Sequence, residues 1–319
     1  MSSKTFLAFG EILWDILPDH TALGGAPFNL AYRASTLGLH AMFASRLGDD
    51  DLGREAFARV EQLGMDTRWI QWDRDHPTGT VDVSLTDDGT PSYVINPGVA
   101  YDFIEPDAAL LTEAGNADCV CYGSLVQRGE VSRITLRELL ERAAGALKLC
   151  DINLRTDCFT PRTVAWSLER ADVLKINEDE VSALAAMFGL ASSDPAGFCV
   201  EASRRWGLSH CVVTLGAAGS LAYAPDVGHV YEPGFRVTVA DSLGAGDSFT
   251  AAFVHGLLRG ESLAECCRRG NAMGALVASE CGGTPAVDAV RVDALLSPGA
   301  DRVWDDRFSS LGREDSSAP

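Results

Sequence analysis

The sequence lacks the features of a membrane protein or a nucleic-acid-binding protein. No stretch reaches about 18 consecutive apolar residues, the length that indicates a membrane-spanning helix, and residues 1–9 show no signal-peptide cleavage pattern. No dense run of Lys and Arg offsets the formal net charge of -19, which repels nucleic acid and anionic lipid surfaces. We therefore expect no nucleic-acid or membrane partner, and a cytoplasmic location.

Several motifs of common enzyme classes are also missing. The sequence has no Gly-x-x-x-x-Gly-Lys-Ser/Thr phosphate-binding loop and no His-Arg-Asp and Asp-Phe-Gly pair, which argues against a P-loop enzyme or a protein kinase. No Gly-x-Gly-x-x-Gly follows the first expected strand, which leaves a dinucleotide-binding dehydrogenase as a weak alternative. The nine cysteines show no Cys-x-x-Cys spacing, a pattern that favours buried, reduced thiols.

What is present describes a globular α/β protein. The 319 residues, 46% of them apolar, suffice for one large domain with a small appendage. Short apolar runs alternate with segments of helical spacing, which predicts a mostly parallel sheet covered by helices on both faces. The expected strands are 5–10, 41–47, 118–124, 147–154, 173–177 and 210–216, and the expected helices are 27–37, 52–63, 131–147, 196–206, 251–260 and 262–279.

One region breaks this alternation. Residues 80–85 and 92–96 alternate in polarity and flank Asp87-Asp88-Gly89-Thr90, a strong hairpin signal. We expect these strands to form a small lid sheet. The predicted organisation is a single domain over residues 1–308, with a lid formed mainly by about 12–22 and 78–100, followed by a flexible tail over 309–319.

The segment around Asp247 carries the chemistry. Residues 237–239 are β-like, and after the Gly244-Ala245-Gly246 turn the apolar residues recur at helical spacing, which places Asp247 in the first turn of a helix. The N–H groups of a helix start can hold phosphoryl oxygens, and the helix dipole favours an ionised carboxylate that can accept a proton. Asp247 or Ser248 acting only as a helix cap is the alternative.

The run from Asp241 to Phe253, DSLGAGDSFTAAF, resembles the C-terminal signature of the ribokinase-like (PfkB) carbohydrate kinases. The resemblance implies the three-layer α/β/α ribokinase-like fold with a small β lid. It also implies that Gly244, Ala245 and Gly246 form an anion hole and that Asp247 is the catalytic base. The resemblance covers almost the whole chain, and the other motifs occur in the same order as in the family.

The N-terminal part is similar to the family's sugar-binding signature, in the run Gly24-Gly25-Ala26-Pro27-Phe28-Asn29-Leu30-Ala31. By this resemblance, Asp15 and Asn29 hydrogen-bond sugar hydroxyls, and Gly24 and Gly25 allow close backbone approach and hinging of the lid. Buried polar groups of this kind discriminate strongly between hydroxylated ligands. An ordinary turn before a helix is the alternative for the two glycines.

Three further motifs concern the nucleotide and its ions. Asn177-Glu178-Asp179-Glu180 resembles the family's Asn-x-x-Glu element, in which Glu180 organises Mg²⁺ through water with Asn177 nearby; complementation of the helix dipole is the alternative. Residues 213–220 resemble the nucleotide-phosphate turn, which is assigned on Thr214, Gly216 and Gly219, with Ala218 where the family often has lysine. Asn271 matches a position that lines the adenosine pocket, although a plain polar helix residue is equally compatible.

Asp241, together with the stretch Cys281-Gly282-Gly283-Thr284-Pro285, resembles a monovalent-cation site of part of the family, where K⁺ would brace the anion hole. Asp241 acting only as a cap of the turn is the alternative.

Two features bear on the sugar. Ala26-Pro27 resembles fructokinases, whereas ribokinases and phosphosugar kinases often have Gly-Gly-Lys-Gly at this place. Residues 151–155 resemble the Asp-Pro-Asn-x-Arg strand end of fructokinases and 2-keto-3-deoxygluconate kinases, with Ile152 replacing proline. Arg155 then either contacts a substrate carboxylate or pairs with a neighbouring residue.

Together the motifs imply an ATP-dependent sugar kinase that transfers the γ-phosphoryl group to a primary hydroxyl, with fructose as the favoured substrate. A kinase of 2-keto-3-deoxygluconate, ribose or nucleosides remains an alternative, as does a non-catalytic sugar- or nucleotide-binding protein of the same fold. The oligomeric state stays open, with a homodimer favoured over other assemblies.

Overall fold

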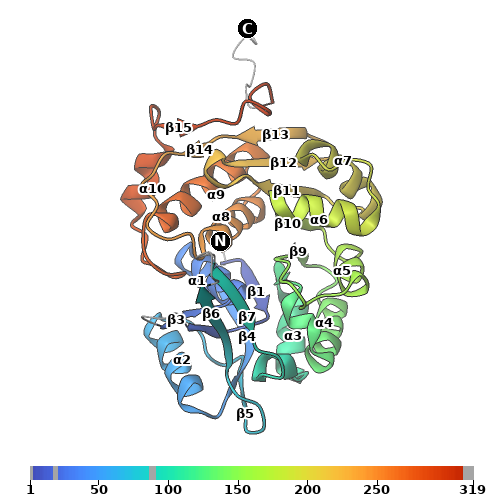
Figure 1. The fold of residues 1–319 in the computed structure, drawn as a ribbon, viewed down its shortest axis with the longest axis vertical. Coiled ribbons are helices and arrows are strands. Elements are labelled where there is room, and N and C mark those ends of the chain that lie inside the picture. Colours follow the sequence, from blue (N-terminus) through green and yellow to red (C-terminus); the bar gives the residue numbers. More distant parts are fainter. Residues whose placement is uncertain (1–2, 17–20, 86–90, 312–319) are drawn as a thin grey trace. The chain divides into compact units, whose positions relative to one another are not determined.

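The computed structural model describes residues 3–16, 21–85 and 91–311. The chain divides into two compact units, shown in Figure 1. The first unit contains residues 1–147 and 155–159, and the second contains residues 148–154 and 160–319. Each unit is described by itself below.

The sheet of the first unit is parallel throughout. Strand β1 (Thr5–Phe9) lies between β4 (His40–Gly48) and β8 (Cys119–Tyr122), and β4 also pairs with β5 (Ile70–Asp73). Phe6 to Phe9 are fully buried, as expected for a strand with both faces covered. The helical elements of this unit are α1 (Ala26–Thr36), α2 (Asp51–Gln62), α3 (Ala108–Asn116), α4 (Glu130–Arg142), η1 (Ala100–Phe103) and η2 (Leu125–Arg128).

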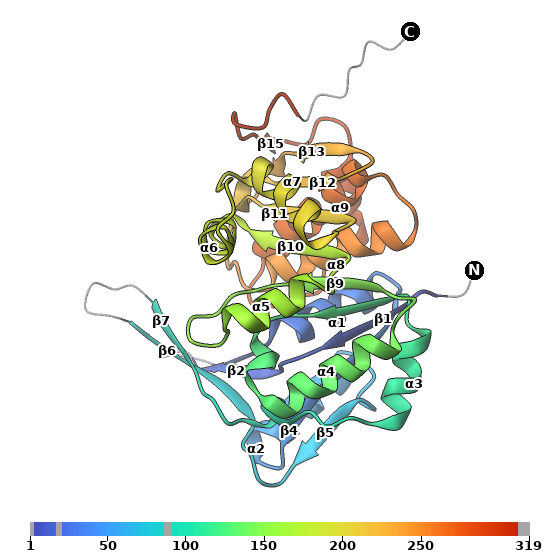
Figure 2. The same cartoon turned by 90° about the vertical axis from the view of Figure 1, so that its right-hand side faces the viewer.

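A second sheet of the first unit contains the expected hairpin strands. Strand β2 (Leu13–Ile16) pairs antiparallel with β3 (Thr21–Gly24) and parallel with β6 (Gly79–Leu85), which pairs antiparallel with β7 (Pro91–Ile95). Figure 2 shows β6 and β7 as a long ribbon that extends away from α3 and α4. The expected turn at residues 87–90 lies outside the described residues.

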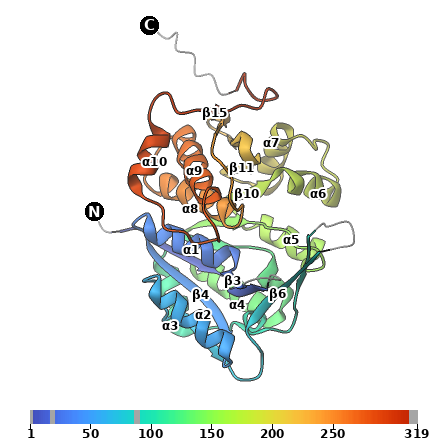
Figure 3. The ribbon, with the colours of Figure 1, turned by 60° about the vertical axis from the view of Figure 1, so that its left-hand side comes forward.

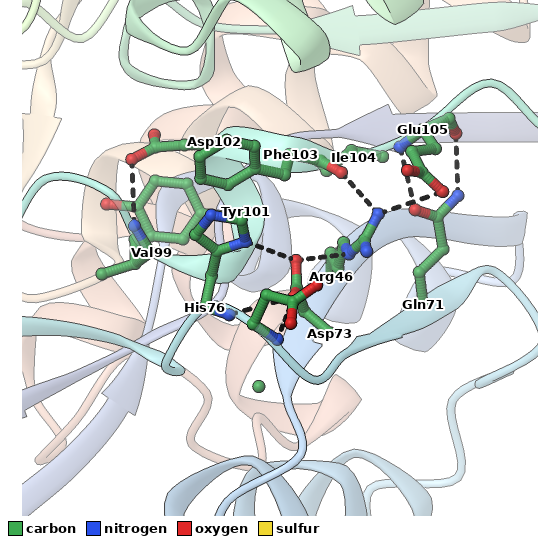
Figure 4. A network of polar contacts seen from close by, with 12 residues as sticks. Arg46, Gln71, Asp73, His76, Val99, Tyr101, Asp102, Phe103, Ile104 and Glu105 are labelled. Carbon is green, nitrogen blue, oxygen red and sulfur yellow. Dashed lines mark hydrogen bonds and ion pairs between the residues drawn. The ribbon is translucent and has the colours of Figure 1, made fainter.

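Polar contacts fix the connection from β5 to β6 (Figure 4). The Asp73 carboxylate lies 2.8 Å from Arg46 Nε and 3.1 Å from His76 Nδ1. The imidazole of His76 stacks on Phe103 with ring centroids 3.5 Å apart, and Arg46 donates to the Phe103 carbonyl at 2.7 Å. These contacts hold the start of the hairpin against η1.

The second unit also has parallel strands. β9 (Leu147–Asp151), β10 (Val173–Asn177) and β11 (His210–Thr214) are parallel, and β12 (Ser220–Ala224) and β13 (Gly228–Glu232) add antiparallel strands. Figures 1 and 3 show α7 and α9 on opposite faces of these strands. The remaining elements are α5 (Pro161–Leu168), α6 (Glu178–Phe188), α7 (Pro195–Trp206), α8 (Ala245–Leu258), α9 (Leu263–Ala278), α10 (Ala289–Leu296), η3 (Gly216–Ala218), β14 (Gly234–Phe235) and β15 (Arg302–Val303).

The predicted α/β class with a mostly parallel sheet is confirmed, but two expected segments are wrong. The helix expected over 131–147 ends at Arg142, because Leu147 instead donates its N–H to the Asp118 carbonyl at 2.9 Å and begins β9. Residues 237–239 are not a strand. Val239 is 61% exposed, and the preceding residues Gly234 and Phe235 form the strand that pairs with β15.

The cysteine prediction is confirmed. All nine cysteines are free, and eight of them are buried. Within the described ranges no helix has the length and apolar character needed to cross a lipid bilayer.

The Asp50 side chain joins α2 to the start of β6. As the N-cap of α2, it accepts a hydrogen bond from the Gly53 N–H at 2.7 Å. It also accepts from the Thr78 N–H at 2.8 Å and from the Thr78 hydroxyl at 2.7 Å. Burial raises the pKa of Asp50, but the hydrogen bonds from Thr78 and Gly53 lower it by more, so the net pKa lies below its ordinary value.

We expect Asp50→Ala to lower the free energy of unfolding by about 3 kcal/mol, since a helix cap contributes about 1 kcal/mol and each further hydrogen bond about 1 kcal/mol. Asp107→Ala is the matched control, because Asp107 caps α3 through Leu110 alone, and it should cost about 1 kcal/mol. Because the folded pKa of Asp50 is depressed, its contribution is complete above about pH 4 and disappears as the pH falls through the folded pKa. Urea unfolding at pH 7 and pH 3 measures both effects, and equal losses in the two variants would contradict the assignment.

Candidate active site

The site in the second unit begins at the N-terminus of α8. Gly244 is the N-cap and has a left-handed backbone, with φ 73°. A Cβ atom at this position would lie 2.5 Å from the Gly283 carbonyl oxygen, so only glycine fits. The first-turn N–H groups of a helix have no partner within the helix. Asp247 lies in that first turn, as predicted, and is partly buried.

Helix α9 packs closely behind this turn. A Cβ atom at Gly274 would lie 3.1 Å from the Ala245 carbonyl oxygen, and one at Gly270 would lie 2.7 Å from the Phe249 ring. The two glycines of α9 therefore allow the backbone and the aromatic ring of α8 to approach closely.

Asp241 holds two turns together beside the start of α8. Its Oδ1 accepts the Leu243 N–H and its Oδ2 accepts the Gly282 N–H, each at 3.0 Å. These bonds favour the capping role that was the alternative to a cation site. They leave further lone pairs on the carboxylate, and the Gly283 carbonyl nearby is an oxygen ligand of the kind that K⁺ takes.

The Asn-x-x-Glu element is a capping box at the start of α6. Asn177 Oδ1 accepts the Glu180 N–H at 2.9 Å, and Glu180 Oε2 accepts the Asn177 N–H at 2.8 Å. Glu180 Oε1 accepts the Leu154 N–H at 2.8 Å. Burial raises the pKa of Glu180 above its ordinary value, although the Lys175 ammonium opposes this. The element thus has a structural role in addition to the one expected for it.

The residues of this element fit Mg²⁺ that is held through water and not by direct ligation. In the part of the chain that the structure describes, no group of three or more His, Cys, Asp or Glu side chains is arranged to hold a metal ion. Mg²⁺ usually keeps several waters and takes few protein ligands beside substrate phosphates. Glu180, whose two oxygens each accept one N–H bond, therefore fits contact with Mg²⁺ through water better than direct ligation.

Three residues that the sequence analysis did not assign lie at this site. Lys175, on β10, places its Nζ atom 3.2 Å from Asp151 Oδ1, and Asp151 Oδ2 accepts the Thr250 hydroxyl at 2.9 Å. Lys175 and Asp151 are both buried. A charged residue inside the apolar run of β10 was a usable signal. The contacts were not readable, because the partners are 24 and 99 residues apart.

Two of the predicted nucleotide residues, Gly219 and Asn271, approach residues 232–234. A Cβ atom at Gly219, which has φ +96°, would lie 2.1 Å from the Glu232 carbonyl oxygen. Asn271 donates from Nδ2 to the carbonyls of Glu232 and Pro233 at 2.9 Å and 3.3 Å. Thr214 and Gly216 belong to the same turn region, where the Thr214 hydroxyl donates to the Ile176 carbonyl at 3.3 Å.

Four of the five predicted sugar residues form a group in the first unit. A Cβ atom at Gly24 would lie 2.9 Å from Asp15 Oδ2, so the missing side chain leaves room beside this carboxylate. Gly25, the N-cap of α1 with φ 116°, has no room for a Cβ atom, which would lie 2.4 Å from the Glu11 carbonyl oxygen. Asn29 is buried on the same helix, 2% exposed.

Glu11 is a further residue of this group that the sequence analysis missed. Its side chain is buried, and Oε1 accepts the Ala26 N–H at 3.3 Å at the start of α1. An acidic residue that interrupts an apolar run was the available signal.

The fifth predicted sugar residue, Arg155, is exposed on the irregular segment that follows β9. The structure does not connect it to the other four.

Comparisons with known proteins identify the family of the chain. Residues 19–289 match the model of the pfkB family carbohydrate kinases. Fructokinase-1 of Zea mays is 29% identical over 315 residues, covering 88% of this chain and 94% of the relative. The fructokinase of Escherichia coli is 29% identical over 276 residues, covering 81% of this chain and 85% of the relative.

Solved structures of similar fold include two bacterial fructokinases. The fructokinase of Xylella fastidiosa with bound ATP has a TM-score of 0.81 at 24% identity, covering 92% of this chain and 98% of that one. The fructokinase of Vibrio cholerae O395 with fructose, ADP and calcium ion has a TM-score of 0.79 at 23% identity, covering 92% and 99%.

The match to the family model and the named relatives identify a phosphotransferase that acts on an alcohol. The chain belongs to the pfkB family of carbohydrate kinases and is an ATP-dependent sugar kinase.

We expect Gly244→Ala to reduce kcat by about 10²–10³-fold, the effect of losing one donor to developing charge, because the new methyl group displaces the turn. Gly282→Ala is the matched control. Gly282 has a similar φ of +80°, but a Cβ atom there has no neighbour within 4 Å. Both variants should lose about 1–2 kcal/mol of stability from the strained backbone. Gly244→Ala should lose more, because its methyl group also meets the Gly283 carbonyl, and it alone should lose turnover. Steady-state kinetics and thermal unfolding measure the two effects, and equal kcat values in both variants would refute the explanation.

Proposed function

We propose that the chain is a fructokinase, which transfers the γ-phosphoryl group of ATP to a primary hydroxyl of fructose. Phosphoryl transfer to a hydroxyl is inferred from one observation: the carboxylate of Asp247 lies in the first turn of α8, directly after the glycine-capped start. Two further observations favour fructose. The curated relatives quoted above are named fructokinases, and Ala26-Pro27 follows the paired glycines.

The proposed mechanism uses the start of α8 twice. Asp247 accepts the proton of the sugar hydroxyl, and the oxygen attacks the γ-phosphorus in line with the leaving ADP. The N–H groups from Gly244 to Gly246 donate to the transferring phosphoryl oxygens. Mg²⁺, when bound, offsets the charge of the nucleotide phosphates, and Glu180 would hold it through water with Asn177 nearby.

The other predicted residues have binding roles in this proposal. Asp15 and Asn29 hydrogen-bond sugar hydroxyls, and Gly24 and Gly25 let the sugar approach the backbone. These buried polar groups select a hydroxylated ligand, because leaving them unpaired is costly. The guanidinium of Arg155 is exposed and is therefore available to bind a substrate carboxylate. Because 2-keto-3-deoxygluconate carries a carboxylate, it is the second candidate substrate. Residues 12–22 and 78–100 act as the lid of a single catalytic domain over residues 1–308.

The nucleotide is assigned to Thr214, Gly216, Gly219 and Asn271, with Ala218 giving no charge contact. Asp241 is assigned to K⁺ as an activating ion, with its capping bonds as the competing role. The protein is proposed to be a cytoplasmic homodimer with no nucleic-acid or membrane partner.

Asp247→Asn should fold normally, bind sugar with a nearly unchanged KM, and lose kcat by about 10³-fold or more, since proton transfer by a positioned base contributes about 10²–10⁴-fold. Asp51→Asn is the matched control, because Asp51 also lies in the first turn of a helix, α2, but is fully exposed there. It should retain full turnover. A coupled assay of ADP release gives both values. Turnover near the unmodified level in Asp247→Asn would refute the assigned base.

ADP release should be highest with fructose in a panel that also contains ribose, 2-keto-3-deoxygluconate and nucleosides. Asp15→Ala should raise the KM for the preferred sugar by about 10- to 100-fold, since a lost hydrogen bond to a charged group costs about 1.5–3 kcal/mol. Preference for 2-keto-3-deoxygluconate together with sensitivity to Arg155→Ala would replace fructose by the second candidate. Absence of ADP with every compound would favour a binding protein without catalysis.

A further inference from the structure

Lys175 is a buried charge whose position needs explanation. It lies in the middle of β10, is 8% exposed, and pairs with the buried Asp151 at 3.2 Å. Burying an ion pair costs desolvation energy, and the attraction between the two charges often does no more than cancel that cost. A buried pair is therefore weak evidence that the pair stabilises the fold. Only three of the 26 basic residues are lysines, so this ammonium is an uncommon group in the chain.

Contacts connect Lys175 to the first turn of α8 along two routes. On the first route, Asp151 Oδ2 accepts the hydroxyl of Thr250, which also lies 2.9 Å from the Gly246 carbonyl oxygen. On the second route, the Nζ atom lies 3.4 Å from the position that a Cβ atom of Gly246 would occupy. A compact ammonium therefore packs against the turn, where the larger, planar guanidinium of Arg would be harder to place.

The charges around Lys175 add a second constraint. Burial lowers the pKa of Lys175, but attraction to the carboxylates of Asp151, Glu180 and Asp247 raises it by more, so the group carries a proton at neutral pH. Of these carboxylates, Asp151 pairs with the ammonium directly, at 3.2 Å. Without that cation the site would be more negative, which would disfavour the phosphates of the nucleotide and weaken phosphoryl transfer.

We propose that Lys175 is a positioning residue of the phosphoryl-transfer site, which holds the turn at Gly246 through Asp151 and Thr250 and fixes Asp247 by its charge. Its action is exerted through Asp247, and the inference therefore rests on the proposed role of that residue as the base. Substrate contact is not required of the ammonium. Its removal should impair turnover more than binding of the sugar.

The test is a double-mutant cycle between Lys175→Met and Asp247→Asn, assayed by ADP release with the preferred sugar at high enzyme concentration. Lys175→Met should lower kcat by about 10- to 100-fold, less than the loss of a group that donates directly to the transition state, and should change the sugar KM by less than about threefold. In the Asp247→Asn background the same change should lower kcat by less than about threefold, because residues that act as a unit are not additive.

Controls separate this role from a contribution to folding. Lys148→Met makes the same substitution on β9 and should leave kcat unchanged. Lys175→Gln keeps a hydrogen-bond donor for Asp151 but removes the charge. If Lys175→Met does not fold, Lys175→Gln replaces it in the double-mutant cycle with Asp247→Asn. Thr250→Val removes the hydroxyl link alone and should lower kcat by a smaller factor than Lys175→Met.

Three results would overturn the inference. They are equal losses for Lys175→Met in both backgrounds, normal turnover in Lys175→Met, and failure of both Lys175 variants to fold, which would assign the lysine to folding alone. Normal turnover in Asp247→Asn by itself refutes the proposed base instead. Failure of the inference and failure of the proposed function are therefore distinguishable.

Discussion

The contact between Gly244 and the Gly283 carbonyl constrains the whole site. A left-handed residue without a side chain lets the chain turn sharply beside that carbonyl and begin α8 immediately. The direction of the first-turn N–H groups and the location of Asp247 follow from where the helix starts. Asp241 supports the same geometry by bonding to the turn before the helix and to the one around Gly282. Backbone N–H groups can supply most of the donors of a phosphate site built this way, which suits a chain of net charge -19.

Several residues of the site have a structural role beside the chemical role proposed for them. Asn177 and Glu180 cap each other at the start of α6 and are also the residues that the family motif assigns to Mg²⁺. Asn271 tethers α9 to residues 232–233 and is also assigned to the adenosine pocket. The alternatives weighed from the sequence therefore do not exclude each other, because one carboxylate or amide has enough lone pairs or protons for two partners.

The sequence predicted those parts of the fold and site that are local. The turn, the helix start and Asp247 are contiguous, and Asn177 and Glu180 are three residues apart, so spacing placed the helix start and a local family motif identified these residues. Lys175, Asp151 and Thr250 meet only because β9 pairs with β10 and α8 packs on the same unit, which no periodicity reveals. Residues 237–239 were misassigned because β-like composition does not supply a pairing partner, and the helix over 131–147 was overextended because Leu147 fits a helix or a strand equally well.

The close packing of α9 against α8 affects how the catalytic turn behaves. Gly270 and Gly274 bring the backbone at Ala245 and the Phe249 ring into direct contact with α9. The start of α8 is thus embedded in the packed interior on that side, where density is that of a crystal and displacement of atoms is costly. The N–H groups proposed as donors to the phosphoryl group would then be oriented before substrate arrives, with little reorganisation as charge develops. An added methyl group at either glycine of α9 would disturb phosphoryl transfer from a distance, without touching any ligand.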